Sequence, residues 1–76
     1  MGELSIMGRQ GDTKIIWDSM RPDEVENARR TFDDLRKKGY LAFAVRGREG
    51  EKGEQITTFD PNAERLIMAP PMRGGR

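Results

Sequence analysis

Short segments in which apolar and polar residues alternate, or in which β-branched and aromatic residues gather, recur along the chain and predict β-strands. The segments are residues 4–8, 13–18, 40–46, 55–59 and 65–69. A short stretch containing Gly8 and Gly11 separates the first two, and residues 47–53, which contain three glycines, separate the third and fourth. Connections of this kind are typical of hairpins. We therefore expect two antiparallel strand pairs followed by a fifth, shorter strand.

A different period marks residues 22–38. Apolar residues there are spaced by three, four and three positions, which places them on one stripe of an α-helix: Val25, Ala28, Phe32 and Leu35. Pro22 suits the first turn, where its missing N–H is not needed, and Gly39 suits the left-handed position after the last turn. A short helical turn is predicted over residues 60–64, where an aspartate precedes a proline.

One amphipathic helix needs one sheet face against which to bury its stripe. The order of elements therefore predicts an α+β fold, in which a mixed sheet of four to five strands packs on a single helix. The predicted core takes one face of each element: Leu4, Ile6, Ile15, Trp17, Val25, Ala28, Phe32, Leu35, Leu41, Phe43, Val45, Ile56, Leu66 and Met68.

The length of 76 residues allows one small domain. We expect that domain over residues 1–70 and a flexible C-terminal tail over residues 71–76. Pro70 and Pro71 cannot continue a sheet ladder, and the residues after them show no core-forming pattern.

Charge and reactive side chains narrow the classes of function. The chain has 14 Lys and Arg residues against 13 Asp and Glu residues, a net charge of +1. A nucleic-acid-binding protein normally has a clear basic excess, so the balance argues against nucleic acid as a partner. Cysteine and histidine are absent, which excludes thiolate and imidazole metal sites, cysteine nucleophiles and histidine bases. We expect a binding or carrier module with no catalytic residue, no metal and no cofactor, and not an enzyme.

The longest apolar runs are only a few residues and fall far short of a membrane span. Residues 1–6 contain Glu3 and no basic region ahead of an apolar stretch, unlike a signal peptide. We therefore expect a cytoplasmic protein without membrane contact. We also expect a monomer.

The order of elements, in a chain of this length, resembles the β-grasp fold of ubiquitin and its prokaryotic relatives. Residues 72–75, Met-Arg-Gly-Gly, look like the Arg-Gly-Gly ending of ubiquitin-like protein modifiers. The likeness covers nearly the whole chain by element order and length, not by sequence identity. It implies that an ATP-using activating enzyme adenylates the Gly75 carboxylate, that a cysteine thioester carries it, and that Gly75 is joined to a target lysine, with Gly74 beside it. Two glycines also make a slim tail that fits a narrow enzyme channel.

Arg76 follows the diglycine, so Gly75 has no free carboxylate in this form. The resemblance therefore implies a tail-processing hydrolase that removes Arg76, as in many precursors of the family. The stretch Pro-Pro-Met at residues 70–72 is stiffer than the usual tail of the family. A plainer interpretation of residues 74–76 is a frayed terminus without function.

One helix covers only one face of a sheet, and apolar residues on the other face suggest a protein partner. The predicted interaction patch consists of Ile16, Tyr40, Ala42, Ile67 and Met72. This patch carries the alternative hypothesis of a non-enzymatic adaptor or structural subunit of a larger assembly, for example a phage particle. A third and weaker hypothesis is nucleic-acid binding by the Arg-rich end of the helix and the tail, which would show a steep salt dependence.

Overall fold

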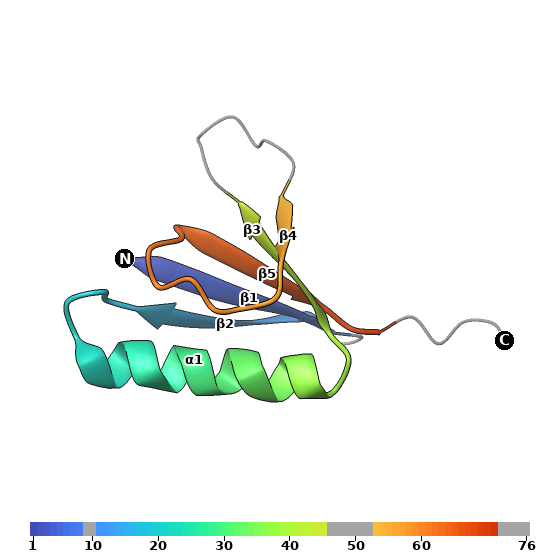
Figure 1. Ribbon diagram of the computed structural model, residues 1–76, viewed down its shortest axis with the longest axis horizontal. Coiled ribbons are helices and arrows are strands. Elements are labelled where there is room, and N and C mark those ends of the chain that lie inside the picture. The colour runs from blue at the N-terminus through green and yellow to red at the C-terminus, as the bar shows by residue number, and fades with distance from the viewer. Residues whose placement is uncertain (9–10, 46–52, 72–76) are drawn as a thin grey trace, which may run out of the picture.

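The structure is a computed structural model that describes residues 1–8, 11–45 and 53–71 (Figure 1). Its elements follow the predicted order: β1 (Gly2–Gly8), β2 (Gly11–Trp17), α1 (Pro22–Lys37), β3 (Leu41–Val45), β4 (Glu54–Ile56) and β5 (Arg65–Ala69). The predicted α+β class is confirmed. The fourth strand is shorter than expected, because pairing with β3 extends only from Glu54 to Ile56.

The five strands form one mixed sheet in the order β2-β1-β5-β3-β4. The hairpins β1–β2 and β3–β4 are antiparallel, as is the pair β3–β5, whereas β1 and β5 run parallel at the centre. The last strand of the chain therefore lies between the two hairpins and joins them into one sheet. This arrangement is compatible with the predicted β-grasp fold.

Helix α1 crosses a single face of this sheet (Figure 1). It begins at Pro22 with Asp23 and Glu24 in its first turn, where carboxylates face the positive end of the helix dipole. It ends before Gly39, which has φ +97° as predicted for the left-handed position. Where a short helical turn was predicted over residues 60–64, the structure has a turn without a helix, closed by a backbone hydrogen bond of 3.2 Å from the N–H of Ala63 to the carbonyl of Asp60.

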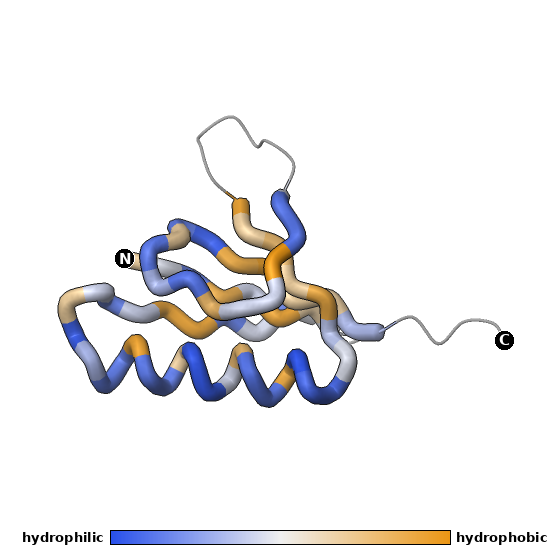
Figure 2. The backbone as a smooth tube through the Cα atoms, in the orientation of Figure 1, coloured by the Kyte–Doolittle hydropathy of each residue, from blue (hydrophilic) through white to orange (hydrophobic). Residues whose placement is uncertain are grey.

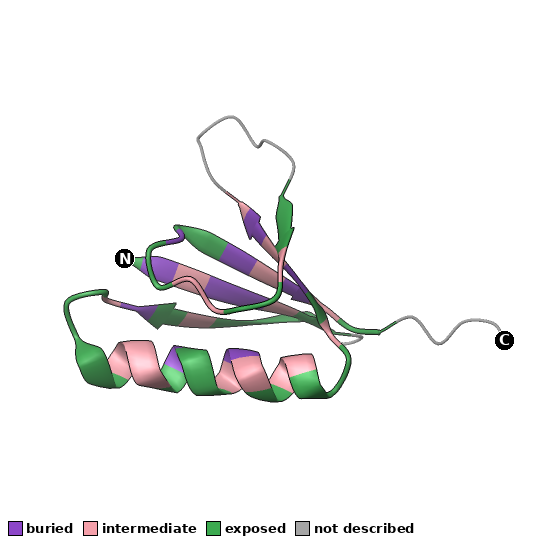
Figure 3. Cartoon of the chain, in the orientation of Figure 1, coloured by how far each residue is buried: buried purple, intermediate pink, exposed green. Residues whose placement is uncertain are grey.

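The core lies between α1 and the sheet, where the buried segments of the strands and the buried stripe of the helix face each other (Figure 3). Trp17 and Phe32 are both fully buried. The ring of Phe59 lies between them, with its centroid 5.0 Å from that of Trp17 and 5.8 Å from that of Phe32. Hydrophobic residues recur along α1 at intervals on the side that faces the sheet, and they are frequent in the strands of the sheet (Figure 2).

Strand β3 presents the opposite face to the helix from the one predicted. The residues expected in the core were Leu41, Phe43 and Val45, but the buried ones are Ala42 at 0% and Ala44 at 1% exposure. Leu41 is 42% exposed. The core assignment of these three larger residues, and the placement of Ala42 in an exposed patch, were wrong.

The pairing of β3 with β5 shows why. Ala42 lies opposite Met68 and Ala44 opposite Leu66, so the two alanines share the face of these buried residues. Trp17 and Phe32 already fill much of the space under the helix. Because β3 is apolar on both faces, its alternation fits either orientation, and the small side chains occupy the side where space is limited.

Candidate interaction face

The outer face of the sheet, which α1 does not cover, is the candidate functional site. We call it the outer face. Its apolar residues come from four strands, with Met7, Ile16 and Leu41 exposed and Phe43, Val45 and Ile67 half-buried. Natural sheets of this kind can leave one face to water, but then that face is mainly polar. The outer face instead carries these six apolar side chains next to its charged and polar ones.

The centre of the outer face is a stripe across β5 and β3. Phe43 lies directly opposite Ile67, and Leu41 lies opposite Ala69 on the same pair of strands. On the other side of β5, Ile67 pairs with Ser5 of β1. The stripe therefore presents an aromatic ring and branched aliphatic side chains on a rigid base, the composition found at the centre of protein–protein interfaces.

Charged side chains flank this stripe on β1, β2 and β5. The carboxylate of Glu3 lies 3.8 Å from Lys14 Nζ and 3.7 Å from Arg65 Nε. It also accepts a hydrogen bond of 3.1 Å from Ser5 Oγ, and Ser5 is only 5% exposed under these neighbours. A hollow of about 150 Å³ opens beside them, with Asp12 in its lining. An apolar centre next to a charged border suits the docking of a folded protein.

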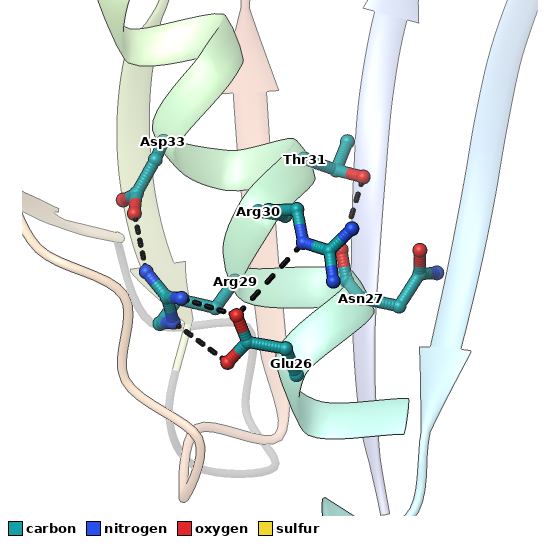
Figure 4. A network of polar contacts seen from close by, with 6 residues as sticks. All are labelled: Glu26, Asn27, Arg29, Arg30, Thr31 and Asp33. Atoms are coloured by element: carbon teal, nitrogen blue, oxygen red, sulfur yellow. Dashed lines mark hydrogen bonds and ion pairs between the residues drawn. The ribbon is translucent and has the colours of Figure 1, made fainter. Parts of the chain in front are cut away.

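Arg29 and Arg30 of α1 are engaged in ion pairs along the helix (Figure 4). Arg29 contacts Glu26 and, at 2.9 Å, Asp33, and Arg30 lies 3.8 Å from Glu26. The hydrogen bond from Arg29 lowers the pKa of Glu26 and raises that of Arg29. Paired charges of this type are typical of a solvated helix face, and they leave less free positive charge for a phosphate.

A groove of about 350 Å³ runs between α1 and β1. Its lining is apolar at Ile6 and Leu35 and polar at the helix residues Asn27, Arg30, Thr31 and Asp34. The described residues contain no group of three or more acidic side chains that could hold a metal ion. In the same part of the chain, no helix has the length and apolar character that crossing a membrane requires.

The predicted patch is partly brought together. Ile16, which is 58% exposed, and Ile67 both lie on the outer face. Ala42 lies beneath the helix instead. Tyr40 precedes β3 and is half-buried against the core, with its carbonyl accepting a hydrogen bond of 2.7 Å from Arg36 Nη1. Met72 lies outside the described residues, as do the residues predicted for conjugation and processing, Gly74, Gly75 and Arg76.

Sequence reasoning missed the residues of β3 that form most of the stripe: Leu41, Phe43 and Val45. The signal that could have found them is the composition of the strand. Its sequence alternates large and small apolar residues, and a helix close to a sheet favours the small ones on its side.

The chain matches no protein-family model, and neither curated proteins nor solved structures show a significant similarity to it. The candidate site is therefore argued from geometry and chemistry.

Proposed function

We propose that this chain is a ubiquitin-like protein modifier or carrier of the β-grasp fold, which acts through Gly75 after removal of Arg76. The observation that carries the proposal is the strand order β2-β1-β5-β3-β4 with a single helix on one face. In this order the final strand is held at the centre of the sheet. In the sequence, the diglycine follows the last residue of β5 by only a few positions, so the proposed reactive end directly succeeds the central strand along the chain.

The proposed chemistry needs three steps. Hydrolysis of the Gly75–Arg76 peptide bond consumes water, releases arginine and leaves a free Gly75 carboxylate. That carboxylate attacks the α-phosphate of ATP, which forms an acyl adenylate and releases pyrophosphate. A thiol and then a lysine amine take over the acyl group in turn: AMP leaves first and the thiol second, and each nucleophile gives up a proton. The chain itself supplies only the carboxylate and a surface that enzymes can recognise.

The outer face is suited to that recognition. An activating enzyme must hold the folded domain while the tail enters its active site. The stripe at Leu41, Phe43 and Ile67 offers an apolar contact on rigid strands, and Arg65 and Glu3 offer charges that fix orientation.

The test uses residues 1–75 and residues 1–76, each incubated with ATP and a lysate of the source organism. Trypsin cleaves after Arg73, so a lysine joined to Gly75 retains a Gly-Gly remnant that tandem mass spectrometry identifies. We expect remnant-bearing lysines with the 1–75 form and, when hydrolases are inhibited, none with the 1–76 form.

Two controls accompany this test. A 1–74 form, which lacks Gly75, should give no adduct, and omission of ATP should abolish the adduct of the 1–75 form. If the 1–75 form remains free of adducts while its fold is intact, the modifier function is rejected.

The apolar outer face by itself favours a second candidate, an adaptor or structural subunit that binds a protein partner without covalent attachment. This candidate predicts a complex that forms without ATP and survives deletion of residues 72–76. Leu41→Asp should abolish the complex, because it places a charge in the stripe. The matched control is Met20→Asp, since Met20 is 84% exposed in the loop between β2 and α1. Equal binding by both variants would reject this candidate.

A further inference from the structure

Strand β2 forms one edge of the sheet, and the pairing on its other side identifies which backbone groups it exposes. The N–H of Glu3 donates to the carbonyl of Glu64 at 3.1 Å, and so points from β1 towards β5. Hydrogen-bonded and non-hydrogen-bonded pairs alternate along an antiparallel ladder. Ile16, the partner of Glu3, therefore directs its own N–H and C=O to the open edge, and the same holds for Lys14 and Asp12.

The side chains on this edge carry a charge pattern that is complementary to itself. Asp12 and Lys14 are both exposed and project from the outer face, whereas Thr13 between them projects on the helix side. If two copies of β2 run antiparallel about Thr13, Asp12 of each copy lies opposite Lys14 of the other. Opposite charges and Thr–Thr pairs across neighbouring strands both stabilise a sheet.

We propose that two copies of this chain associate through the β2 edge, with β2 strands antiparallel and Thr13 on the two-fold axis. The outward N–H and C=O groups of Asp12 in one copy then bond to those of Lys14 in the other. The two sheets become one continuous sheet with both helices on the same side. The association would replace the monomer expected in the sequence analysis, and it is independent of the proposed function.

The charges favour antiparallel pairing centred on Thr13 over pairing centred on residue 12, 14 or 15. If residue 12 lies on the two-fold axis, Asp12 of one copy is opposite Asp12 of the other, and if residue 14 lies on it, Lys14 is opposite Lys14. A centre at residue 15 brings Asp12 opposite Asp18. Like charges directly opposite each other destabilise a strand pair. Among centres from residue 12 to residue 15, only the one at Thr13 opposes no like charges.

Pairing of two β2 strands would also cover the exposed backbone groups of this edge strand. A seven-residue edge strand presents a row of unpaired backbone groups, and proteins shield such rows with charges, bulges or a covering element. Here the charges are balanced rather than of one sign, so the edge is complementary to a second copy of itself in the register centred on Thr13.

The experiment measures the mass of the full chain by sedimentation equilibrium from micromolar to millimolar concentration. We expect a monomer–dimer equilibrium in the wild type. Asp12→Lys or Lys14→Glu removes two attractive pairs and creates two repulsive ones, and should raise the dimer dissociation constant about tenfold or more. The double variant D12K/K14D restores the pairs with exchanged signs and should regain dimerisation. Lys37→Glu, an equal charge change on the exposed end of α1, should leave it unchanged.

Amide hydrogen exchange gives an independent readout on the same samples. The amides of Asp12 and Lys14 should exchange more slowly as the concentration rises, whereas those of Thr13 and Ile15, which already pair with β1, should not change. A wild type that stays monomeric throughout, or single variants that dimerise as well as the wild type, overturns the proposal. A double variant that is folded but fails to recover also overturns it.

Discussion

At the residue scale, Gly2 and Trp17 pack directly against each other. They are opposite partners at one end of the β1–β2 hairpin, and both are buried. The indole ring lies across Gly2, and its Nε1 donates a hydrogen bond of 3.1 Å to the carbonyl of Pro61. A side chain at position 2 would occupy the space of this ring, so the absence of a Cβ at Gly2 allows Trp17 to close the core.

We predict that Gly2→Ala destabilises the protein, because the added Cβ would overlap the Trp17 indole ring. Forcing atoms into a packed core typically costs about 1–3 kcal/mol. Urea denaturation followed by tryptophan fluorescence would measure the change in the free energy of unfolding. Met20→Ala is the control and should stay within about 0.5 kcal/mol of the wild type. A more stable Gly2→Ala variant would contradict the described packing, since removal of a glycine otherwise favours folding.

At the scale of elements, α1 has acidic residues in its first turn and basic residues in its last turn, but its N-terminal cap is weak. Arg21 occupies the cap position in an extended conformation and makes no side-chain hydrogen bond to the helix. Glu24, in the first turn, instead accepts a hydrogen bond of 2.8 Å from the N–H of Asp18. The helix is therefore held at its start by the preceding loop and by Pro22, and its capping can be improved.

We predict that Arg21→Ser stabilises the protein, since a serine oxygen at this position can accept a free N–H of the first turn. The expected gain in the free energy of unfolding is about 1 kcal/mol. Arg30→Ser removes the same charge within the helix and serves as the control, where serine should give no gain. Thermal and urea unfolding of the three proteins would measure this. Equal effects of both substitutions would show that charge, not capping, is responsible.

At the scale of the whole molecule, the orientation of β3 decides which surface is available to partners. With its alanines inward, α1 lies close to the sheet and the larger side chains of the strand are displaced to the outer face. In this orientation Ala42, which was predicted in the interaction patch, lies beneath the helix, and Leu41 and Phe43 lie on the outer face instead. A local property of one strand thus determines the chemistry of the candidate site.

We predict that Ala42→Leu and Leu41→Ala have very different effects, although they exchange the same two residue types on neighbouring positions. Ala42 is fully buried beneath α1, so a leucine there should cost about 1–3 kcal/mol by overpacking. Leu41 is 42% exposed, and its truncation should cost under about 1 kcal/mol. Chemical denaturation measures both values. If Leu41→Ala were the more damaging change, β3 would face the other way.

Most of the architecture could be predicted because its signals are local. The helix followed from the spacing of Val25, Ala28 and Phe32 and from Gly39 at its end, and β5 was located at its observed residues. The candidate site was predicted less well: Ile16 and Ile67 lie on the outer face, but Ala42 does not. Whether the C-terminal diglycine is functional remains a prediction, since it lies outside the described residues.

The sequence by itself determined the order of the elements, the amphipathic stripe of the helix and the alternation within each strand. These depend on backbone geometry and on neighbours a few residues away. Only the tertiary structure decided the parallel pairing of β1 with β5 and the face of β3 that lies under the helix. The pairing joins strands from opposite ends of the chain, and the face of β3 depends on the space beside Trp17, Phe32 and Phe59, which also come from distant parts of the chain. Close packing of such residues is a property of the assembled core, which periodicity along one segment does not record.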